Sequence, residues 1–270
     1  MGNYKLIAVD MDGTLLREDK TISDRTKEAI RGAVQKGVKV VLASGRPIEG
    51  LERYLNELEL TSENDYVMSF NGSLIQNVKT RQIVSKNILK GSDLKKLYAL
   101  SKEIGVNIHA FTKQGCITPK MNEYTQLEGR INGIEIYEAD FDTLSEEEDV
   151  IKVMFIDPQP VLEEAMKKIP EAYYEEFTIV RSAPFFLEFL NKQSSKGTGI
   201  KALGDHLHIS REEIICIGDA GNDLDMIEFA GLGVAMGNAF PEVKEAADYI
   251  TSTNEEDGVA HVIEKFIGIG

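Results

Sequence analysis

Short apolar runs alternate with longer amphipathic stretches over the first third of the chain. Leu6–Asp10 and Val38–Ala43 are apolar at nearly every position, which is typical of strands buried on both faces of a parallel sheet. Tyr66–Phe70 predicts a third such strand. Between the first two strands, Ser23 can cap a helix and Gly37 can end it. This alternation predicts an α/β fold with a doubly wound parallel sheet.

The last third of the chain repeats the same alternation. We expect helices over Gly197–His206 and Asp223–Phe229, with a buried strand at Ile214–Gly218 between them. A short strand over Gly233–Met236 and a closing helix over Val259–Phe266 follow. The shared pattern predicts that the first and last thirds of the chain belong to one α/β unit.

The middle of the chain has a different pattern, because its apolar runs are shorter and several alternate in polarity. This difference predicts an α+β domain at 84–190, inserted into a core formed by 1–83 and 191–270. In the first third, Pro47 is also placed to open a helix in its first turn. The expected elements of the insert are helices over Leu94–Ile104 and Val161–Ile169 and strands over Ile151–Ile156, Thr178–Val180 and Phe186–Leu190.

Composition narrows the possible partners. The 270 residues are 42% hydrophobic and 28% charged, as is usual for a globular protein, and carry a formal net charge of −15. This acidity argues against binding to nucleic acid, which needs Lys and Arg, and against anionic membranes. Cys116 and Cys216 are expected to be buried free thiols. No leader and no membrane-spanning run is recognisable, so we expect a cytoplasmic protein.

Polar side chains follow three of the predicted strands where each one ends. Because the carboxyl ends of parallel strands share one edge of a sheet, we expect these side chains to converge there. Lys196 stands at the start of a predicted helix, where a cation gains nothing from the helix dipole, and this favours a functional reason for it. The strand-ending side chains are Asp10 and Asp12, then Ser44, Gly45 and Arg46, and finally Asp219, Asn222 and Asp223.

Two motifs give the chain a family resemblance. The sequence Asp10-Met11-Asp12-Gly13-Thr14, together with Gly218-Asp219-Ala220-Gly221-Asn222-Asp223, resembles the haloacid dehalogenase superfamily of phosphatases. Ser44-Gly45-Arg46-Pro47 and the segment around Lys196 fall in the same order and spacing. More narrowly, the chain is similar to the Cof-type group with a large class IIB cap, and to the YidA-like sugar phosphatases. The resemblance covers essentially the whole chain.

The resemblance implies roles for the two motif carboxylates. Asp10 would attack phosphorus and form an aspartyl-phosphate. Asp12 would protonate the leaving alkoxide and then activate the water that hydrolyses the intermediate. The expected activity is therefore hydrolysis of small phosphomonoesters, sugar phosphates among them, by a phosphoric monoester hydrolase.

The resemblance also implies a metal site and a phosphate site. A cation is needed between phosphate and several carboxylates, and all-oxygen ligands suit Mg²⁺. Asp10, the backbone carbonyl of Asp12 and Asp219 would hold this ion, with Asp223 behind them orienting a water or Lys196. The groups expected to bind the phosphoryl oxygens are Ser44, Gly45, Lys196 and Asn222.

The sequence leaves several alternatives open. A phosphomutase or phosphotransferase would use the same residues, and a regulatory protein phosphorylated on Asp10 is a third possibility. Roles for Arg46 and Asn71 stay open, as do the substrate and the oligomeric state. The insert is expected to close over Asp10 as a cap and to exclude water. Its possible substrate contacts, for each of which ordinary surface charge is the favoured interpretation, are His109, Lys113, Arg130 and Arg181.

Overall fold

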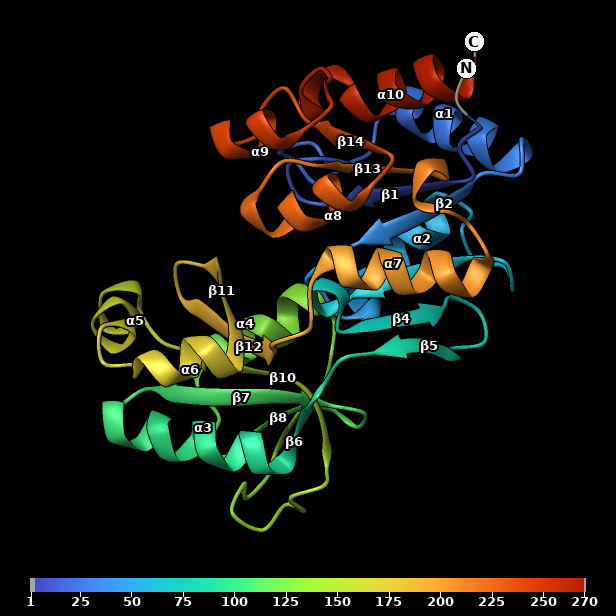
Figure 1. Ribbon diagram of the computed structural model, residues 1–270. Helices are drawn as coiled ribbons and strands as arrows, with labels where there is room; N and C mark the ends of the chain where they lie inside the picture. The colour runs from blue at the N-terminus through green and yellow to red at the C-terminus, as the bar shows by residue number, and fades with distance from the viewer. Residues whose placement is uncertain (1–2, 270) are drawn as a thin grey trace. The chain divides into compact units, whose positions relative to one another are not determined.

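The computed structural model describes residues 3–269, and it divides the chain into two compact units (Figure 1). The first is made of Met1–Ile48, Glu52–Lys86 and Ser195–Gly270. The second is made of Glu49–Leu51 and Asn87–Ser194. A cap function for the second unit stays a prediction. No helix within residues 3–269 has the length and apolar character needed to cross a bilayer.

One sheet runs through the first unit. Its central strands are parallel, with Leu6 of β1 beside Ile214 of β13 on one side and beside Lys39 of β2 on the other. The last two strands on the β2 side form an antiparallel extension. In order across the sheet, the strands are β15 (Tyr249–Ile250), β14 (Leu232–Ala235), β13 (Ile214–Gly218), β1 (Leu6–Asp10), β2 (Lys39–Ala43), β3 (Tyr66–Ser69), β4 (Leu74–Asn77) and β5 (Ile83–Lys86).

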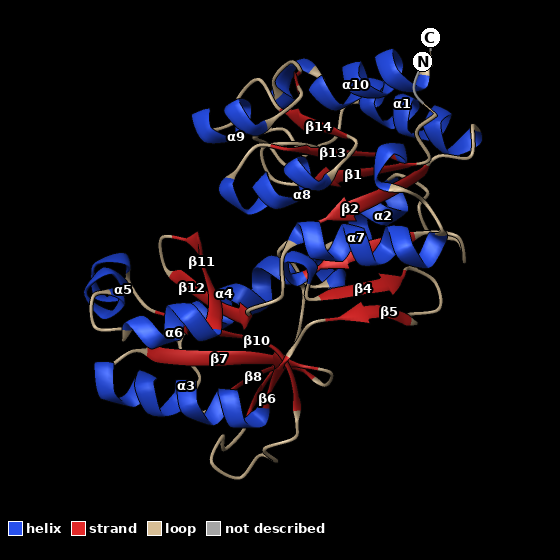
Figure 2. Ribbon diagram, viewed as in Figure 1, coloured by secondary structure: helices blue, strands red, loops and turns tan. Residues whose placement is uncertain are grey.

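Helices pack against this sheet because its strands are apolar on both faces (Figure 2). Leu6 and Ala8 of β1 belong to the same core cluster as Ile200 of α7 and Met226 of α8. Ile7 of β1 is equally buried but points to the opposite face. Helices α1 and α10 pack against each other, and α1 packs on β2. The predicted α/β fold is confirmed. The α-helices of this unit are α1 (Asp24–Gln35), α2 (Glu52–Glu57), α7 (Lys196–Leu207), α8 (Leu224–Phe229), α9 (Pro241–Ala246) and α10 (Gly258–Ile267).

Short 3₁₀ turns stand where the sequence suggested longer helices or simple turns. Pro47 does not open an α-helix directly. A 3₁₀ turn over Ile48–Gly50 comes first, because Gly50 is a poor helix former, and α2 begins at Glu52. The other such turns are η2 (Phe70–Gly72), η3 (Arg211–Glu213), η4 (Gly221–Asp223) and η5 (Asn254–Glu256).

The second unit is built on a mixed sheet. One face belongs to an apolar core that includes Val153, Phe155 and Phe189 together with Leu97 of α3 and Leu162 of α5. Its strands, in order, are β11 (Phe177–Ala183), β12 (Phe186–Asn191), β10 (Asp149–Ile156), β7 (Asn107–Thr112), β8 (Gly115–Thr118) and β9 (Ile136–Glu138), with β6 (Leu89–Lys90) also on β10. Its helices are α3 (Gly91–Ile104), α4 (Glu123–Asn132), α5 (Gln159–Met166) and α6 (Glu171–Glu176).

Candidate active site

Three carboxylates meet at the carboxyl edge of the first unit's sheet. Asp10 ends β1, Asp219 follows β13, and Asp223 ends the 3₁₀ turn after it. Each offers an oxygen within 4.8 Å of the other two. Asp10 and Asp223 are buried, and Asp219 is partly buried. The expected convergence of these motif residues is therefore present in the structure.

Lys196 lies between two of these carboxylates. It is the first residue of α7, whose start is fixed by Ser195, because the Ser195 hydroxyl accepts a hydrogen bond from the Thr198 N–H. The fully buried Lys196 ammonium donates to a carboxylate oxygen of Asp10 and, at 2.6 Å, to Oδ1 of Asp223. A buried lysine is stable here because two carboxylates satisfy it.

The cluster carries more negative than positive charge. Three carboxylates face one ammonium group, so full ionisation leaves two negative charges uncompensated among the described residues. Burial, with the nearby charge of Asp223, raises the pKa of Asp10 to about 8 despite Lys196. Burial likewise raises the pKa of Asp219 to about 6. Burial opposes the charge of Lys196, but Asp10 and Asp223 outweigh it and raise the pKa of Lys196. A divalent cation would balance this excess of negative charge, and the carboxylate oxygens of the cluster are donors that suit Mg²⁺.

The hydrogen bonds of the carboxylates separate their possible roles. Oδ2 of Asp223 accepts the N–H groups of Asp219 at 3.0 Å and Ala220 at 3.1 Å, while its Oδ1 accepts from Lys196. Both oxygens of Asp223 are therefore used inside the protein. Oδ1 of Asp219 accepts the Thr14 hydroxyl at 2.7 Å. This pattern suits Asp219 better than Asp223 as a direct ligand of a metal ion.

Gly13 brings the first motif close to Asp219. Its φ of +87° is a left-handed conformation, and a Cβ atom there would lie 2.4 Å from Oδ2 of Asp219. Any side chain would therefore strain the backbone and collide with the carboxylate. The glycine of the motif lets the turn after β1 contact the loop after β13.

Asp12 is held by two cations outside the buried cluster. The Arg46 guanidinium donates to both of its oxygens, at 2.8 and 2.7 Å, and the Lys20 ammonium donates to Oδ1 at 2.8 Å. Partial burial of Asp12 opposes its ionisation, but these partners outweigh burial and lower its pKa. The sequence leaves a role for Arg46 open, and no motif marks Lys20. Lys20 reaches Asp12 because the chain turns back at residues 17–21, where the Arg17 N–H bonds to the Thr21 carbonyl.

The loops after β2, β3 and β13 are linked beside this cluster. Ser44 is buried, and its hydroxyl accepts the Arg46 N–H at 3.2 Å. A Cβ atom on Gly45 would lie 3.0 Å from the side-chain amide nitrogen of Asn71. The Asn222 side chain donates to Oδ1 of Asn71 at 3.2 Å. Asn71 therefore joins the predicted phosphate-binding residues to one another.

The four candidate contacts in the second unit have different surroundings. The surface interpretation is wrong for His109, which is fully buried, and burial, with the charge of Lys152, lowers its pKa to about 3. Histidine is a polar residue type, so the sequence did not indicate that it would be buried. It is buried because both faces of its strand are covered. Lys113 is paired with Asp149 at 2.9 Å. Arg181 reaches Glu163 at 3.4 Å, and Arg130 is exposed.

Comparisons with known proteins identify the family. The model of the haloacid dehalogenase-like hydrolases matches residues 7–263. The chain belongs to this family. It is 44% identical over 266 residues to "Putative phosphatase YxeH" of Bacillus subtilis, with 98% of each chain covered. The prediction of an enzyme of the phosphatase type, made from the Asp10 and Asp219 motifs, is confirmed.

Solved structures of the family agree with this assignment. A haloacid dehalogenase-like hydrolase from Bacteroides thetaiotaomicron superimposes with a TM-score of 0.86 at 36% identity, covering 97% of this chain and 99% of that one. The subclass IIB sugar phosphatase BT4131 superimposes with a TM-score of 0.81 at 29% identity, covering 98% of this chain and 100% of that one. The resemblance to Cof-type enzymes with a class IIB insert is thereby supported for the whole chain.

Proposed function

We propose that this protein is a Mg²⁺-dependent phosphatase that hydrolyses small phosphomonoesters, with sugar phosphates as the main class, through an aspartyl-phosphate on Asp10. One observation carries the proposal: Asp10, Asp219 and Asp223 meet at the carboxyl edge of a parallel sheet, where the buried Lys196 pairs with Asp10 and Asp223. A buried cluster with excess negative charge is costly in a protein that does not use it.

Asp10, Asp219 and the backbone carbonyl of Asp12 would hold the Mg²⁺ ion. When bound, this ion neutralises carboxylate charge and polarises the phosphoryl group. Asp223 would act behind them, because its oxygens already bond Lys196 and two backbone N–H groups. Its role would be to keep Lys196 directed at Asp10.

Asp10 would supply the nucleophile. One of its oxygens forms a bond to phosphorus as the bond from phosphorus to the ester oxygen breaks, and Asp12 gives its proton to the departing alkoxide. A water molecule then attacks phosphorus and loses its proton to Asp12. The bond to Asp10 breaks, which releases inorganic phosphate, restores the Asp10 carboxylate and leaves Asp12 protonated, as it was at the start.

The phosphoryl oxygens need donors beside Asp10. The Ser44 hydroxyl already accepts the Arg46 N–H, which leaves its own proton for a phosphoryl oxygen. The Gly45 N–H and the Asn222 amide would add donors from neighbouring loops, and Lys196 would add positive charge. Arg46 and Lys20 would favour the ionised form of Asp12 in the free protein, and Asp12 would take up from solvent the proton that it donates once substrate displaces them.

The substrate class rests on the comparison with the sugar phosphatase of subclass IIB. We propose that the second unit serves as the specificity cap and that small phosphorylated metabolites are the partners. The net charge of −15 gives no support to nucleic acid or anionic membranes as partners. A cytoplasmic location stays a prediction.

The experiment is a phosphatase assay on the purified protein with an aryl phosphate and a panel of phosphorylated metabolites. We expect turnover with Mg²⁺ and none with a chelator. Asp10→Asn should lower kcat by a factor of about 10⁴ or more, because the nucleophile is lost. Asp24→Asn, at a carboxylate in the first turn of α1, is the matched control and should leave turnover unchanged. Turnover by Asp10→Asn would contradict the proposal.

The same assay tests the other candidate functions. A phosphomutase would convert a sugar monophosphate into its positional isomer, with a sugar bisphosphate as the phosphoryl donor and without net release of phosphate. A regulatory phosphoprotein would keep its aspartyl-phosphate for minutes and show little turnover. Rapid release of phosphate, with no transfer to a sugar hydroxyl, is the result that hydrolysis requires.

A further inference from the structure

Two asparagines from the last quarter of the chain bind the backbone of the turn that follows β1. The side-chain amide of Asn238 donates to the Gly13 carbonyl at 2.8 Å. The side-chain amide of Asn254 donates to the Leu16 carbonyl at 2.9 Å. The two are also linked to each other, because the Asn254 N–H donates to Oδ1 of Asn238 at 3.0 Å. We call Asn238 and Asn254 the asparagine clamp.

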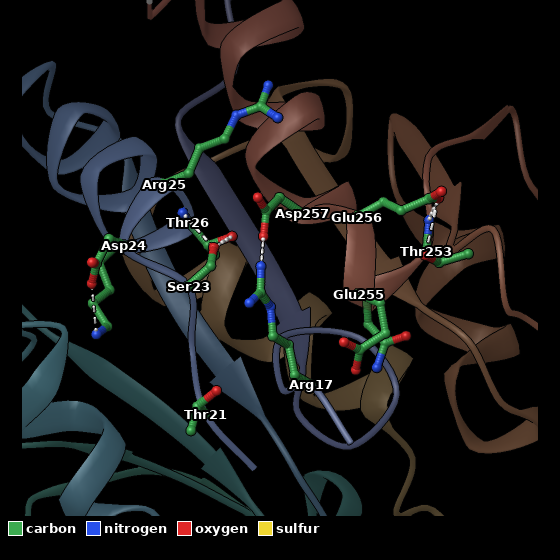
Figure 3. A network of polar contacts seen from close by, with 12 residues as sticks. Arg17, Thr21, Ser23, Asp24, Arg25, Thr26, Thr253, Glu255, Glu256 and Asp257 are labelled. Atoms are coloured by element: carbon green, nitrogen blue, oxygen red, sulfur yellow. Dashed lines mark hydrogen bonds and ion pairs between the residues drawn. The ribbon is translucent and has the colours of Figure 1, made fainter. Parts of the chain in front are cut away.

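The clamp is continued by contacts further along the turn (Figure 3). Arg17 extends toward the start of α10 and pairs with Asp257 at 2.9 Å, while the Glu18 N–H donates to a carboxylate oxygen of Glu255 at 2.7 Å. All these partners come from residues 254–257, which are far from the turn in sequence. The part of the turn from Leu16 to Glu18 is therefore held by one distant segment, while Asn238 holds Gly13 from another.

The loop that carries Asn238 is also bonded to the backbone around Asp219. The Phe240 N–H donates to the Asp219 carbonyl at 3.0 Å, and the Met236 N–H donates to the Gly218 carbonyl at 3.0 Å. One loop therefore holds the Gly13 carbonyl through its asparagine and the Asp219 segment through its backbone. This loop therefore sets the distance between the Gly13 carbonyl and the Asp219 segment.

The clamped stretch of the turn contains the contacts that matter for a metal ion. Thr14 lies between the two clamped carbonyls, and its hydroxyl bonds to Asp219. Gly13 itself lies against the Asp219 carboxylate. A shift of the turn would move the Asp12 carbonyl, the Thr14 hydroxyl and Asp219 relative to one another. Hydrogen-bonding partners behind metal ligands commonly change metal affinity when they are altered.

We propose that Asn238 and Asn254 are positioning residues that set the divalent-cation affinity of the site, by holding the turn after β1 against Asp219. The inference rests on the proposed function, because it takes the cation to bind at Asp10 and Asp219. It assigns a task to side chains that lie outside the two catalytic motifs.

The test uses Asn238→Asp and Asn254→Asp. Each variant loses the amide donor and keeps an acceptor of the same size, so Asp at position 238 can still accept the Asn254 N–H. The matched control is Asn56→Asp, since Asn56 donates to the Glu52 carbonyl at 2.8 Å within α2. The probe is Mn²⁺ or Mg²⁺ alone, titrated into metal-free full-length protein in a calorimeter, with thermal unfolding measured in chelator.

We expect cation binding to weaken by about ten-fold or more in each clamp variant and to stay unchanged in Asn56→Asp. The added negative charge attracts a cation, so weaker binding would report lost geometry. The Mg²⁺ concentration for half-maximal phosphatase activity should rise in parallel, while KM for the phosphomonoester at saturating Mg²⁺ changes little. Folded clamp variants with wild-type cation affinity would overturn the inference.

Two further outcomes distinguish a failure of the clamp proposal from a failure of the proposed function. If Asn238→Asp does not fold, Asn254→Asp and the milder Asn238→Ser supply the same comparison. If the wild-type protein binds the cation but hydrolyses no phosphomonoester, the proposed function is wrong. Weakened binding in the clamp variants would still support the clamp in that case, because calorimetry does not depend on turnover.

Discussion

The guanidinium of Arg46 grips both oxygens of the Asp12 carboxylate, with Nη2 at 2.8 Å from Oδ1 and 2.7 Å from Oδ2. Asp12 is the residue proposed to give and take the proton during turnover. Its cationic partners lower its pKa, which favours the base form needed for the second step. In the first step Asp12 must carry a proton. Arg46 therefore has to release the Asp12 carboxyl group, or to contact both that group and the incoming substrate.

Replacement of Arg46 is expected to shift the pH dependence of the reaction. In Arg46→Met the pKa of Asp12 should rise, because the guanidinium that donates to both of its oxygens is gone. The limb of the pH–rate profile that reports Asp12 should then move to higher pH, whether Asp12 acts as acid or as base in the limiting step. The measurement is kcat/KM against pH for an aryl phosphate.

The control for this prediction is Arg81→Met. Arg81 pairs with Glu52 in the same unit and is more exposed than Arg46, and Asp12 is not among its ion-pair partners. Its profile should overlay that of the wild type. An unchanged pH–rate profile in Arg46→Met would show that Arg46 does not influence the acid/base step.

Removal of Lys196 is expected to damage both stability and turnover. Lys196→Met leaves the buried Asp10 and Asp223 without their cation, which should cost about 3–5 kcal/mol of unfolding free energy above about pH 8, where Asp10 is ionised. Turnover should fall by about 10²–10³-fold. The raised pKa of Lys196 means that its contribution persists up to its ordinary pKa of 10.5 and is lost only at higher pH. Chemical denaturation and steady-state kinetics are the measurements.

Lys201→Met is the matched control on the same helix. Its ammonium is exposed and lies 3.6 Å from Asp205, so its loss should change stability by less than about 0.5 kcal/mol. The stability defect of Lys196→Met should shrink as the pH falls through about 8, where Asp10 takes up a proton. A defect of equal size at all pH values would argue against electrostatic support as its cause.

The metal-free protein is expected to lose stability as pH rises. The pKa values of Asp10 and Asp219, about 8 and about 6, lie above the ordinary value of 3.8, so the native state holds more protons than the unfolded chain in this window. The unfolding free energy in chelator should therefore decrease from about pH 4 to about pH 8. Mg²⁺ should restore stability most at the alkaline end, because it competes with protons for these carboxylates.

Calorimetry in buffers of different ionisation enthalpy should detect the protons that Mg²⁺ releases near neutral pH. Asp10→Asn removes the group with the highest carboxyl pKa and should flatten the decline measured in chelator. A metal-free protein that became more stable over the same interval would contradict the ionisation assigned to the cluster.

A methyl group at Gly13 is expected to disrupt the site beyond its backbone strain. Gly13→Ala places Cβ against Asp219, whereas Gly37→Ala at a similar φ of +83° has nothing within 4 Å. Both variants should lose roughly 1 kcal/mol to the left-handed conformation. Only Gly13→Ala should also lose cation binding and turnover. Equal activity in the two variants would mean that the turn can move away from Asp219 without consequence.

The parts of the fold that sequence predicts well are those with a single strong pattern. β1 and β13 are apolar at almost every position, and both proved to be buried strands ending at motif carboxylates. Lys196 was singled out because a cation at a helix start is unfavourable, and it does lie between two carboxylates. Such signals depend on local chemistry, which the sequence carries directly.

The missed elements have patterns that their surroundings override. β7 was not predicted, because its buried polar His109 interrupts the apolar pattern. The strand expected over Ile151–Ile156 is present within β10, but the burial of its charged Lys152, paired with Glu188 at 3.1 Å, could not be read from the residue type. The contact of Lys20 with Asp12 depends on how a turn bends, so residue types alone could not reveal it.

The central pairing of β1 with β13 bears on how the protein is made. Leu6 is translated before the second unit but lies beside Ile214, which is translated only after that unit. The first unit must therefore wait as an incomplete sheet with an open edge, while residues 87–194 can fold from neighbouring sequence. We expect nascent chains that end before β13 to need chaperone protection, and Asp10 to acquire its surroundings only after β13 has been translated.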